Sequence, residues 1–248
     1  SSDLTPSVCR VGNDFYLVNS SFEYFPGIPI YHSTDLTHWE QIGHVLDRKN
    51  QLKLVSGAPN CLGIYAPTIR YHEGIFYCIV TNVGGRSGGN FFVYTTDPYG
   101  RWSNPVKLPF AGIDPSLFFD EDGRIYYTGT DTGIYIAEIT FDVVRNDTPK
   151  RNELPVSIQN VKCGEKHYIW NGSGGNNPEG PHLYRIHDMY YLMIAEGGTE
   201  YCHMVTIARS KNVYGPYEAC PHNPVLSNRS TCLNIKAIGH ADLVEDSQ

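Results

Sequence analysis

Two acidic residues stand in matching short motifs in the middle of the chain. Asp114 opens D-P-S-L, and Glu179 immediately precedes G-P-H-L. A pair of carboxyl groups can divide acid–base work, since one protonates a leaving oxygen while the other activates water or attacks directly. Two close carboxylates also repel each other, which raises the pKa of one and suits it to the acid role. The pair is the minimum equipment for cleaving a glycosidic bond, although either residue alone is equally compatible with a turn or a solvated loop.

The motifs that carry these acids belong to a series of five. T-P-S-V starts at Thr5, A-P-T-I at Ala66, D-P-S-L at Asp114, G-P-H-L at Gly180 and H-A-D-L at His240, with spacings of 61, 48, 66 and 60 residues. After each of the first four comes a strand-like run, a polar turn and an aromatic strand, which is the pattern of a β-hairpin. A repeat of this length with one antiparallel sheet per unit is typical of a β-propeller.

The repeat predicts an all-β fold, a five-bladed β-propeller whose first strand in each blade lines the central channel. The fifth motif is followed by a single strand-like run, H-A-D-L-V-E-D-S-Q, so the fifth blade is expected to be incomplete in this chain. A partner chain or a second copy could complete it, because an open blade exposes unpaired strand edges. No linker divides residues 1–248, which we interpret as a single propeller domain. A β-sandwich built from regular hairpins is the structural alternative.

Equivalent blades would gather the motif starts at one mouth of the channel. Asp114 and Glu179 would then meet there, with Thr5 and His240 beside them. At the axis, His240 is expected to be a polar hub that hydrogen-bonds a carboxylate or ligates a metal. Aromatic rings stack on the apolar faces of sugars, and the candidates near strand ends are Phe22, Tyr24, Phe25 and Tyr65. The A-E-G-G-T run at 195–199 is either a turn or a loop that frames the sugar.

Composition narrows the partners and the compartment. The net charge is −7 and no Lys/Arg run stands out, so neither nucleic acid nor an anionic membrane surface is an expected partner. The seven cysteines show no C-x-x-C spacing, and Cys9 and Cys78 are expected to be buried free thiols. Sequons favour a secreted or extracellular protein, with a cytoplasmic one as the alternative, and they begin at Asn19, Asn146, Asn171 and Asn228.

Several long stretches resemble glycoside hydrolase family 43, and most closely its β-xylosidase and α-L-arabinofuranosidase branch. They are S-S-F-E-Y-F-P-G-I-P-I-Y-H-S-T-D-L-T-H-W, G-I-Y-A-P-T-I-R-Y-H-E-G, D-P-S-L-F-F-D-E-D-G, E-G-P-H-L-Y-R, A-E-G-G-T-E-Y-C-H-M-V-T-I-A-R-S and I-G-H-A-D-L-V. They cover nearly the whole chain in order. The resemblance implies a five-bladed propeller that hydrolyses xylose- or arabinose-containing glycosides with inversion, on a pentose-containing oligosaccharide or polysaccharide.

The resemblance also implies roles for particular residues. Glu179 matches the general acid, and Asp114 matches the third acidic residue, which tunes the pKa of that acid and orients it. Phe22 and Tyr65 match aromatic positions beside the bound sugar. His240 matches an axial histidine that in many members lies near a central ion, often calcium, so a structural calcium near the axis is expected although no cofactor is required.

Two departures from the family pattern bear on the function. The general base of the family is an Asp in D-P-S, where this chain has Thr5, and a threonine hydroxyl has no useful acid–base pKa. Asp3 is two residues upstream, about 6.6 Å along a strand, and is the substitute base that the sequence offers. The family also has further strands after G-H-A-D-L-V, usually with an Arg that enters the site, and often a β-sandwich domain. Neither is present in this sequence.

The missing Asp leaves two hypotheses open. The first is an inverting pentosidase, and the alternative is a catalytically impaired propeller that binds sugar. A third class, the retaining sucrose- or fructan-cleaving propellers, requires an N-terminal Asp nucleophile in a W-M-N-D-P-N-like run that is absent.

Overall fold

The computed structural model describes residues 5–54, 60–84 and 88–245. Within these ranges the regular structure consists of strands alone, in four antiparallel sheets. The first sheet contains β1 (Ser7–Val11), β2 (Asp14–Val18), β3 (Gly27–Ser33) and β4 (Glu40–Leu46). The second contains β5 (Gly63–Ile64), β6 (Thr68–His72), β7 (Ile75–Val83), β8 (Gly89–Thr95) and β9 (Val106–Lys107).

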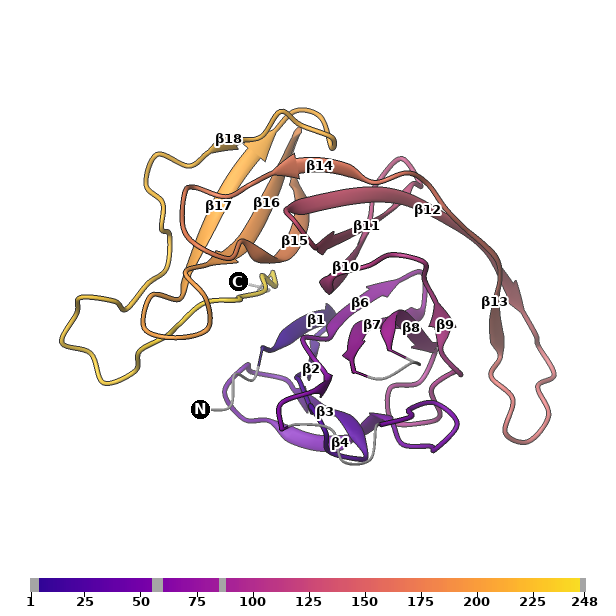
Figure 1. The fold of residues 1–248 in the computed structure, drawn as a ribbon. Helices are drawn as coiled ribbons and strands as arrows, with labels where there is room; N and C mark the ends of the chain where they lie inside the picture. The colour runs from indigo at the N-terminus through magenta and orange to yellow at the C-terminus, as the bar shows by residue number, and fades with distance from the viewer. Residues whose placement is uncertain (1–4, 55–59, 85–87, 246–248) are drawn as a thin grey trace.

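The other two sheets continue the same order along the chain. The third contains β10 (Ile113–Phe119), β11 (Ile125–Thr130), β12 (Ile134–Arg145), β13 (Val156–Cys163) and β14 (His167–Trp170). The fourth contains β15 (Glu179–Ile186), β16 (Met189–Glu196), β17 (Met204–Ser210) and β18 (Glu218–Ala219). Figure 1 shows the four sheets following one another around the molecule, with β1, β6, β10 and β15 on the inner side. The described residues include no helix that is long and apolar enough to cross a membrane.

The predicted hairpins are confirmed in all four sheets. Two-residue turns join β1 to β2, β6 to β7 and β15 to β16, while a longer turn joins β10 to β11. The short turns contain left-handed residues, including Gly12, Gly74 and His187. This backbone matches the twist of the strands that it connects. The polar G-N-D, H-E-G and I-H-D runs therefore set the register of the inner strands.

Consecutive aromatic residues supply two neighbouring cores at once. Side chains of a strand alternate between its faces. Phe76 accordingly packs in the core shared by the first and second sheets, while Tyr77 packs in the core shared by the second and third. Tyr127 joins that second core, and Tyr126 packs between the third and fourth sheets. Burial on both faces explains why these strands are apolar almost throughout.

The expected strand at H-A-D-L-V is wrong for the residues that the structure describes. Residues 240–245 form no strand, because no neighbouring strand pairs with them there. The segment nevertheless reaches the inner strands, since Tyr184 of β15 accepts a hydrogen bond from the backbone N–H of Leu243 at 2.9 Å. In Figure 1 the yellow C-terminal segment runs between the fourth and the first sheet toward the middle of the molecule.

Candidate active site

A pocket of about 480 Å³ opens beside the inner strands of all four sheets. Its lining includes Thr5, Phe22, Tyr65, Asp114, Glu179 and His240, and also Tyr24 from the aromatic candidates. Phe25 does not line it, and Asp3 lies outside the described residues. Residues as far apart in the sequence as Thr5 and His240 thus meet in one pocket, as equivalent repeat units require.

Asp114 and Glu179 are brought together by the same backbone irregularity in two adjacent sheets. The pairing register shifts between Ile113 and Ser116 in β10, and between Glu179 and His182 in β15. At the corresponding repeat positions the backbone is left-handed, with φ +54° at Asp114 and +60° at Gly180. Such a bulge redirects a side chain out of the regular strand. Here it places both carboxyl groups along the pocket.

A hydrogen bond joins the two acidic motifs directly. The backbone N–H of Gly180 donates to Oδ2 of Asp114 at 3.1 Å. Asp114 is buried, with 6% of its surface exposed. The carboxylate of one sheet therefore holds the backbone next to Glu179 in the other sheet. This contact can fix the direction in which the Glu179 side chain points. Asp114 can therefore orient Glu179 in addition to acting on it through its charge.

His240 fills the space above Gly180. It is buried, and its φ of +48° repeats the left-handed backbone of Asp114 and Gly180. A Cβ atom at Gly180 would lie 2.8 Å from Cε1 and Nε2 of the imidazole ring of His240, so only glycine allows this contact. The imidazole consequently sits next to the backbone that carries Glu179.

The described part of the chain contains no cluster of carboxylates that could hold a calcium ion at the axis. No group of three or more His, Cys, Asp or Glu side chains there is arranged to hold a metal ion. Calcium takes six to eight oxygen ligands, usually with several carboxylates among them. The calcium expected near His240 therefore stays a prediction.

The aromatic wall of the pocket is built by a contact between the first two sheets. Phe22 and Ile64 form an isolated bridge, with N–H···O distances of 2.9 and 3.0 Å. The next residue, Tyr65, places its ring edge-on to Phe22, at 6.0 Å between centroids. Burial raises the pKa of Tyr65, and nearby Cys61 and Asp114 raise it further. Its hydroxyl therefore stays protonated at neutral pH and can donate to a sugar oxygen.

Thr5 faces the same pocket and is held by a neighbouring hydroxyl. Its Oγ1 lies 2.7 Å from Oγ of Ser20, within hydrogen-bonding distance. Thr5 offers the pocket a hydroxyl at the repeat position where Asp114 offers a carboxylate. The threonine can bind a sugar or a water molecule, but it cannot take a proton from water as a carboxylate does.

The pocket also contains residues that the motif series did not point to. Glu23, Cys61 and Thr199 line it, as does Tyr24, which is 69% exposed at the rim. In the sequence, Glu23 and Tyr24 belong to the aromatic run at 22–25 and Thr199 belongs to the G-G-T run, whereas no pattern indicated Cys61. Glu23 accepts a hydrogen bond from the backbone N–H of Cys61 at 3.2 Å. It is a third carboxylate in the pocket, beside Asp114 and Glu179.

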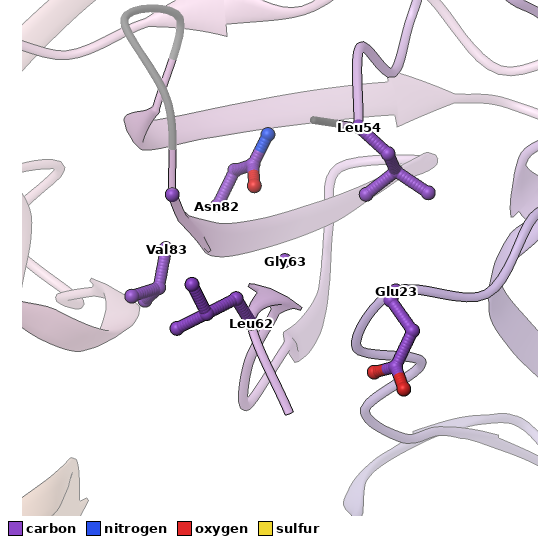
Figure 2. A pocket seen from close by; sticks show the side chains of 7 residues that line it. Glu23, Leu54, Leu62, Gly63, Asn82 and Val83 are labelled. Atoms are coloured by element: carbon purple, nitrogen blue, oxygen red, sulfur yellow. The ribbon is translucent and has the colours of Figure 1, made fainter. Parts of the chain in front are cut away.

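Glu23 also borders a second cavity of about 40 Å³. Figure 2 shows its side chain across from Leu62 and Val83, with Asn82 above. A water molecule needs roughly 10–15 Å³ of such space, so this cavity holds a few water molecules at most. It is too small for a sugar.

A buried ionic cluster lies among the inner strands. Both carboxylate oxygens of Asp242 accept hydrogen bonds from the guanidinium of Arg70, at 2.7 and 3.1 Å. Asp242 also accepts from the hydroxyls of Ser7 and Tyr184, each at 2.5 Å. Although burial alone raises it, the pKa of Asp242 is held well below its usual range by Arg70. Asp242 thus ties the C-terminal segment to β1, β6 and β15.

His182 completes the cluster as a neutral imidazole. Its Nδ1 lies 2.7 Å from Nη2 of Arg70, which can only donate, so this nitrogen accepts. Burial lowers the pKa of His182 to about 3. The negative charge of Asp242 raises this pKa, while the positive charge of Arg70 lowers it further. Ser7, His182 and Asp242 each stand at the third position of a motif of the series, but the series did not predict that they meet around Arg70.

We expect the protein to lose stability as the pH falls below about 6.5, partly through His182. The unfolded chain binds a proton at His182 near pH 6.5, whereas the folded chain binds it only near pH 3. Stability from this group is therefore complete above pH 6.5 and is lost as the pH falls toward 3. His182→Asn should reduce the drop in unfolding free energy between about pH 7.5 and about pH 5 by up to about 2 kcal/mol. Urea unfolding at both pH values measures it, and an unchanged drop would contradict the assignment.

Comparison with known proteins gives the site a family context. The model of glycosyl hydrolases family 43 matches residues 2–248. A xylosidase/arabinosidase of Butyrivibrio fibrisolvens is 47% identical over 250 residues, covering 97% of this chain and 46% of that protein. A non-reducing end α-L-arabinofuranosidase of Bacteroides ovatus is also 47% identical, covering 97% and 43%. The chain spans about half the length of the curated relatives it matches.

Solved structures agree with this grouping. The crystal structure of a xylan β-1,4-xylosidase from Bacillus halodurans C-125 superposes with a TM-score of 0.84 at 36% identity, covering 98% of this chain and 47% of that one. The likeness therefore extends over both sequence and fold. The chain belongs to glycosyl hydrolases family 43.

Proposed function

We propose that the protein releases xylose or arabinofuranose units from pentose-containing glycans by hydrolysis with inversion. The observation that carries this proposal is the single pocket that holds Asp114 and Glu179 together with the Phe22–Tyr65 ring pair. Relatives that are 39–47% identical bear xylosidase or arabinosidase names. They give no support to the alternative of a propeller that only binds sugar.

In the proposed reaction Glu179 is the general acid and protonates the leaving oxygen. Asp114 orients it, through the hydrogen bond that its carboxylate accepts from the N–H of Gly180. Tyr65 and Phe22 hold the sugar, and His240 keeps the backbone beside Glu179 in place. Water attacks the opposite face of the sugar, which in inverting enzymes requires a base carboxyl roughly 6.5–9.5 Å from the acid.

The general base has two candidate carboxylates in this chain. Thr5 occupies the position of the family's base, and Asp3 remains the candidate from the sequence, outside the described residues. Glu23 is the remaining carboxylate of the described pocket lining. Asp3→Asn and Glu23→Gln, assayed side by side, assign the role to whichever variant loses turnover.

Hydrolysis of 4-nitrophenyl β-xyloside and 4-nitrophenyl α-L-arabinofuranoside tests the proposed activity. The longest natural form of the protein that contains these 248 residues is the form to assay. Turnover of either substrate, with inverted product seen by NMR, supports the proposal and identifies the pentose. Background rates on both, unchanged by Glu179→Gln, would overturn it.

Thr5→Asp is expected to raise kcat at least tenfold. A carboxylate at this position regains the general-base assistance that a hydroxyl cannot provide, which is typically worth about 10²–10⁴-fold. Thr5→Asn is the matched control, since it has the same shape as the aspartate but cannot accept a proton from water. Initial rates on the better aryl glycoside measure the effect. No rise, or an equal rise with Thr5→Asn, would show that the base lies elsewhere.

We further infer that the fold is a five-bladed propeller in which the C-terminal segment opens the fifth blade. Supporting this, His240 has the same left-handed backbone as Asp114 and Gly180, and Asp242 binds the inner strands on either side of the axis. The remaining strands of that blade would come from additional residues, a partner chain or a second copy. We also propose secretion on the strength of the four sequons, and a single domain for residues 1–248.

A further inference from the structure

Glu196, the last residue of β16, is a buried carboxylate that does not line the pocket. Glu196 is 0% exposed, and it is not among the residues that line the pocket. Oε1 accepts a hydrogen bond from the backbone N–H of Gly175 at 2.7 Å, and Oε2 accepts from the backbone N–H of Ser173 at 2.9 Å. Oε2 also accepts from the hydroxyl of Ser173 at 2.9 Å and from that of Thr206. The cost of burying this carboxylate is offset by these donors.

The donors of Glu196 lie on the segment that leads directly to Glu179. Residues 171–178 connect β14 to β15, whose first residue is Glu179. A Cβ atom at Gly172 would lie 2.6 Å from Oε1 of Glu196, so the segment wraps tightly around the carboxylate. The backbone N–H of Gly197 donates to the carbonyl of Asn176 at 2.7 Å, which adds a further tie.

The same strand end also pairs with Glu179 itself. Ala195, the neighbour of Glu196, is the cross-strand partner of Glu179. The end of β16 therefore holds both the segment before Glu179 and Glu179 itself. From the other side, Asp114 accepts the N–H of Gly180. The backbone of the acid is thus fixed before, at and after the residue, and Glu196 supplies the first of these three anchors.

We propose that Glu196 is a positioning residue, which fixes the 171–178 segment so that Glu179 reaches the leaving oxygen. This inference rests on the proposed glycosidase function. A proton donor must come within about 2.6–3.2 Å of the atom that it protonates. A misplacement of about 1 Å can cost about 10²-fold in rate. Loss of the Glu196 anchor should therefore act on proton donation and not on sugar binding.

The variants to compare are Glu196→Met and Glu196→Gln. Methionine keeps the volume but removes every acceptor from the donors of Ser173 and Gly175. Glutamine keeps the shape and one carbonyl acceptor, and the hydroxyls of Ser173 and Thr206 can accept from its amide group. The expected order of activity is wild type, then Glu196→Gln, then Glu196→Met. Ser173→Ala combined with Thr206→Val tests the same anchor more gently if the methionine variant does not fold.

The leaving group distinguishes positioning from general weakening. Dinitrophenolate leaves without protonation, whereas phenolate needs the acid. Glu196→Met is expected to lower kcat about 10²-fold on the phenyl glycoside. On the dinitrophenyl glycoside of the same pentose the loss should be less than about threefold, with KM little changed on both.

Asp120→Asn is the matched control. Asp120 is also a buried carboxylate, bound by Arg185 at 2.8 Å and Tyr190 at 2.6 Å, but it follows the far end of β10 from Asp114. Its loss should affect both substrates equally. Equal losses on both substrates for Glu196→Met, in a variant folded by circular dichroism, would overturn the positioning role while leaving the glycosidase function standing. A wild-type protein that turns over neither substrate would overturn both.

Discussion

Glu179→Gln is expected to lower kcat by about 10²–10⁴-fold on a phenyl glycoside, the largest effect that we predict for activity. Glutamine has the shape of the protonated acid but cannot give up a proton to the leaving oxygen. The loss should shrink strongly on the dinitrophenyl glycoside, whose leaving group needs no proton. The basic limb of the pH–rate profile should also disappear, because that limb reports the deprotonation of the acid.

Asp114→Asn provides the comparison for this result. It keeps an oxygen that can accept the N–H of Gly180, but it removes the charge that faces the pocket. We expect a smaller loss than for Glu179→Gln, with the basic limb retained at a shifted position. A Glu179→Gln variant that keeps both its rate and its basic limb would show that another group is the acid.

Asp242→Asn is expected to cost about 3–5 kcal/mol of unfolding free energy, the largest effect that we predict for stability. The substitution leaves the guanidinium of Arg70 buried without its carboxylate, beside an imidazole that must stay neutral. Domains of ordinary stability have about 5–15 kcal/mol in total, so a large share would be lost. Urea unfolding at pH near 7 measures the change.

Activity should fall along with stability in this variant. Asp242 is two residues from His240, and it holds that segment against β1, β6 and β15. Asp122→Asn is the matched control, because the Asp122–Arg124 pair at 3.6 Å is exposed and worth at most about 1 kcal/mol. An Asp242→Asn variant within about 1 kcal/mol of wild type would contradict the importance of the cluster.

The sequence predicted those features that depend on local pattern. Two-residue alternation makes consecutive aromatics such as Tyr126 and Tyr127 point to opposite faces, so strands with two buried sides can be recognised from composition. Polar turn residues mark the hairpins. Because each repeat unit folds in the same way, the matching places of Asp114 and Glu179 predicted their meeting in one pocket.

Residues outside the repeat could not be found in this manner. Glu196 has no counterpart in the motif series, and its partners Ser173 and Thr206 lie on either side of it in the chain with no shared pattern. Glu23 was overlooked because it lies between the aromatic residues that were the candidates for sugar stacking. The strand expected from His240 onward was wrong, since apolar alternation indicates a strand only where another strand is present to pair with it.

By itself, the sequence determined the repeat, the inner strands of four sheets and the meeting of the motif residues Thr5, Asp114, Glu179 and His240 in one pocket. Only the tertiary structure decided how Arg70, His182 and Asp242 close the axis, and how Glu196 holds the segment before Glu179. The reason is physical. Hairpins and alternating faces follow from neighbours in the chain, whereas a buried charge is stable only where distant strands bring its partners within hydrogen-bonding distance.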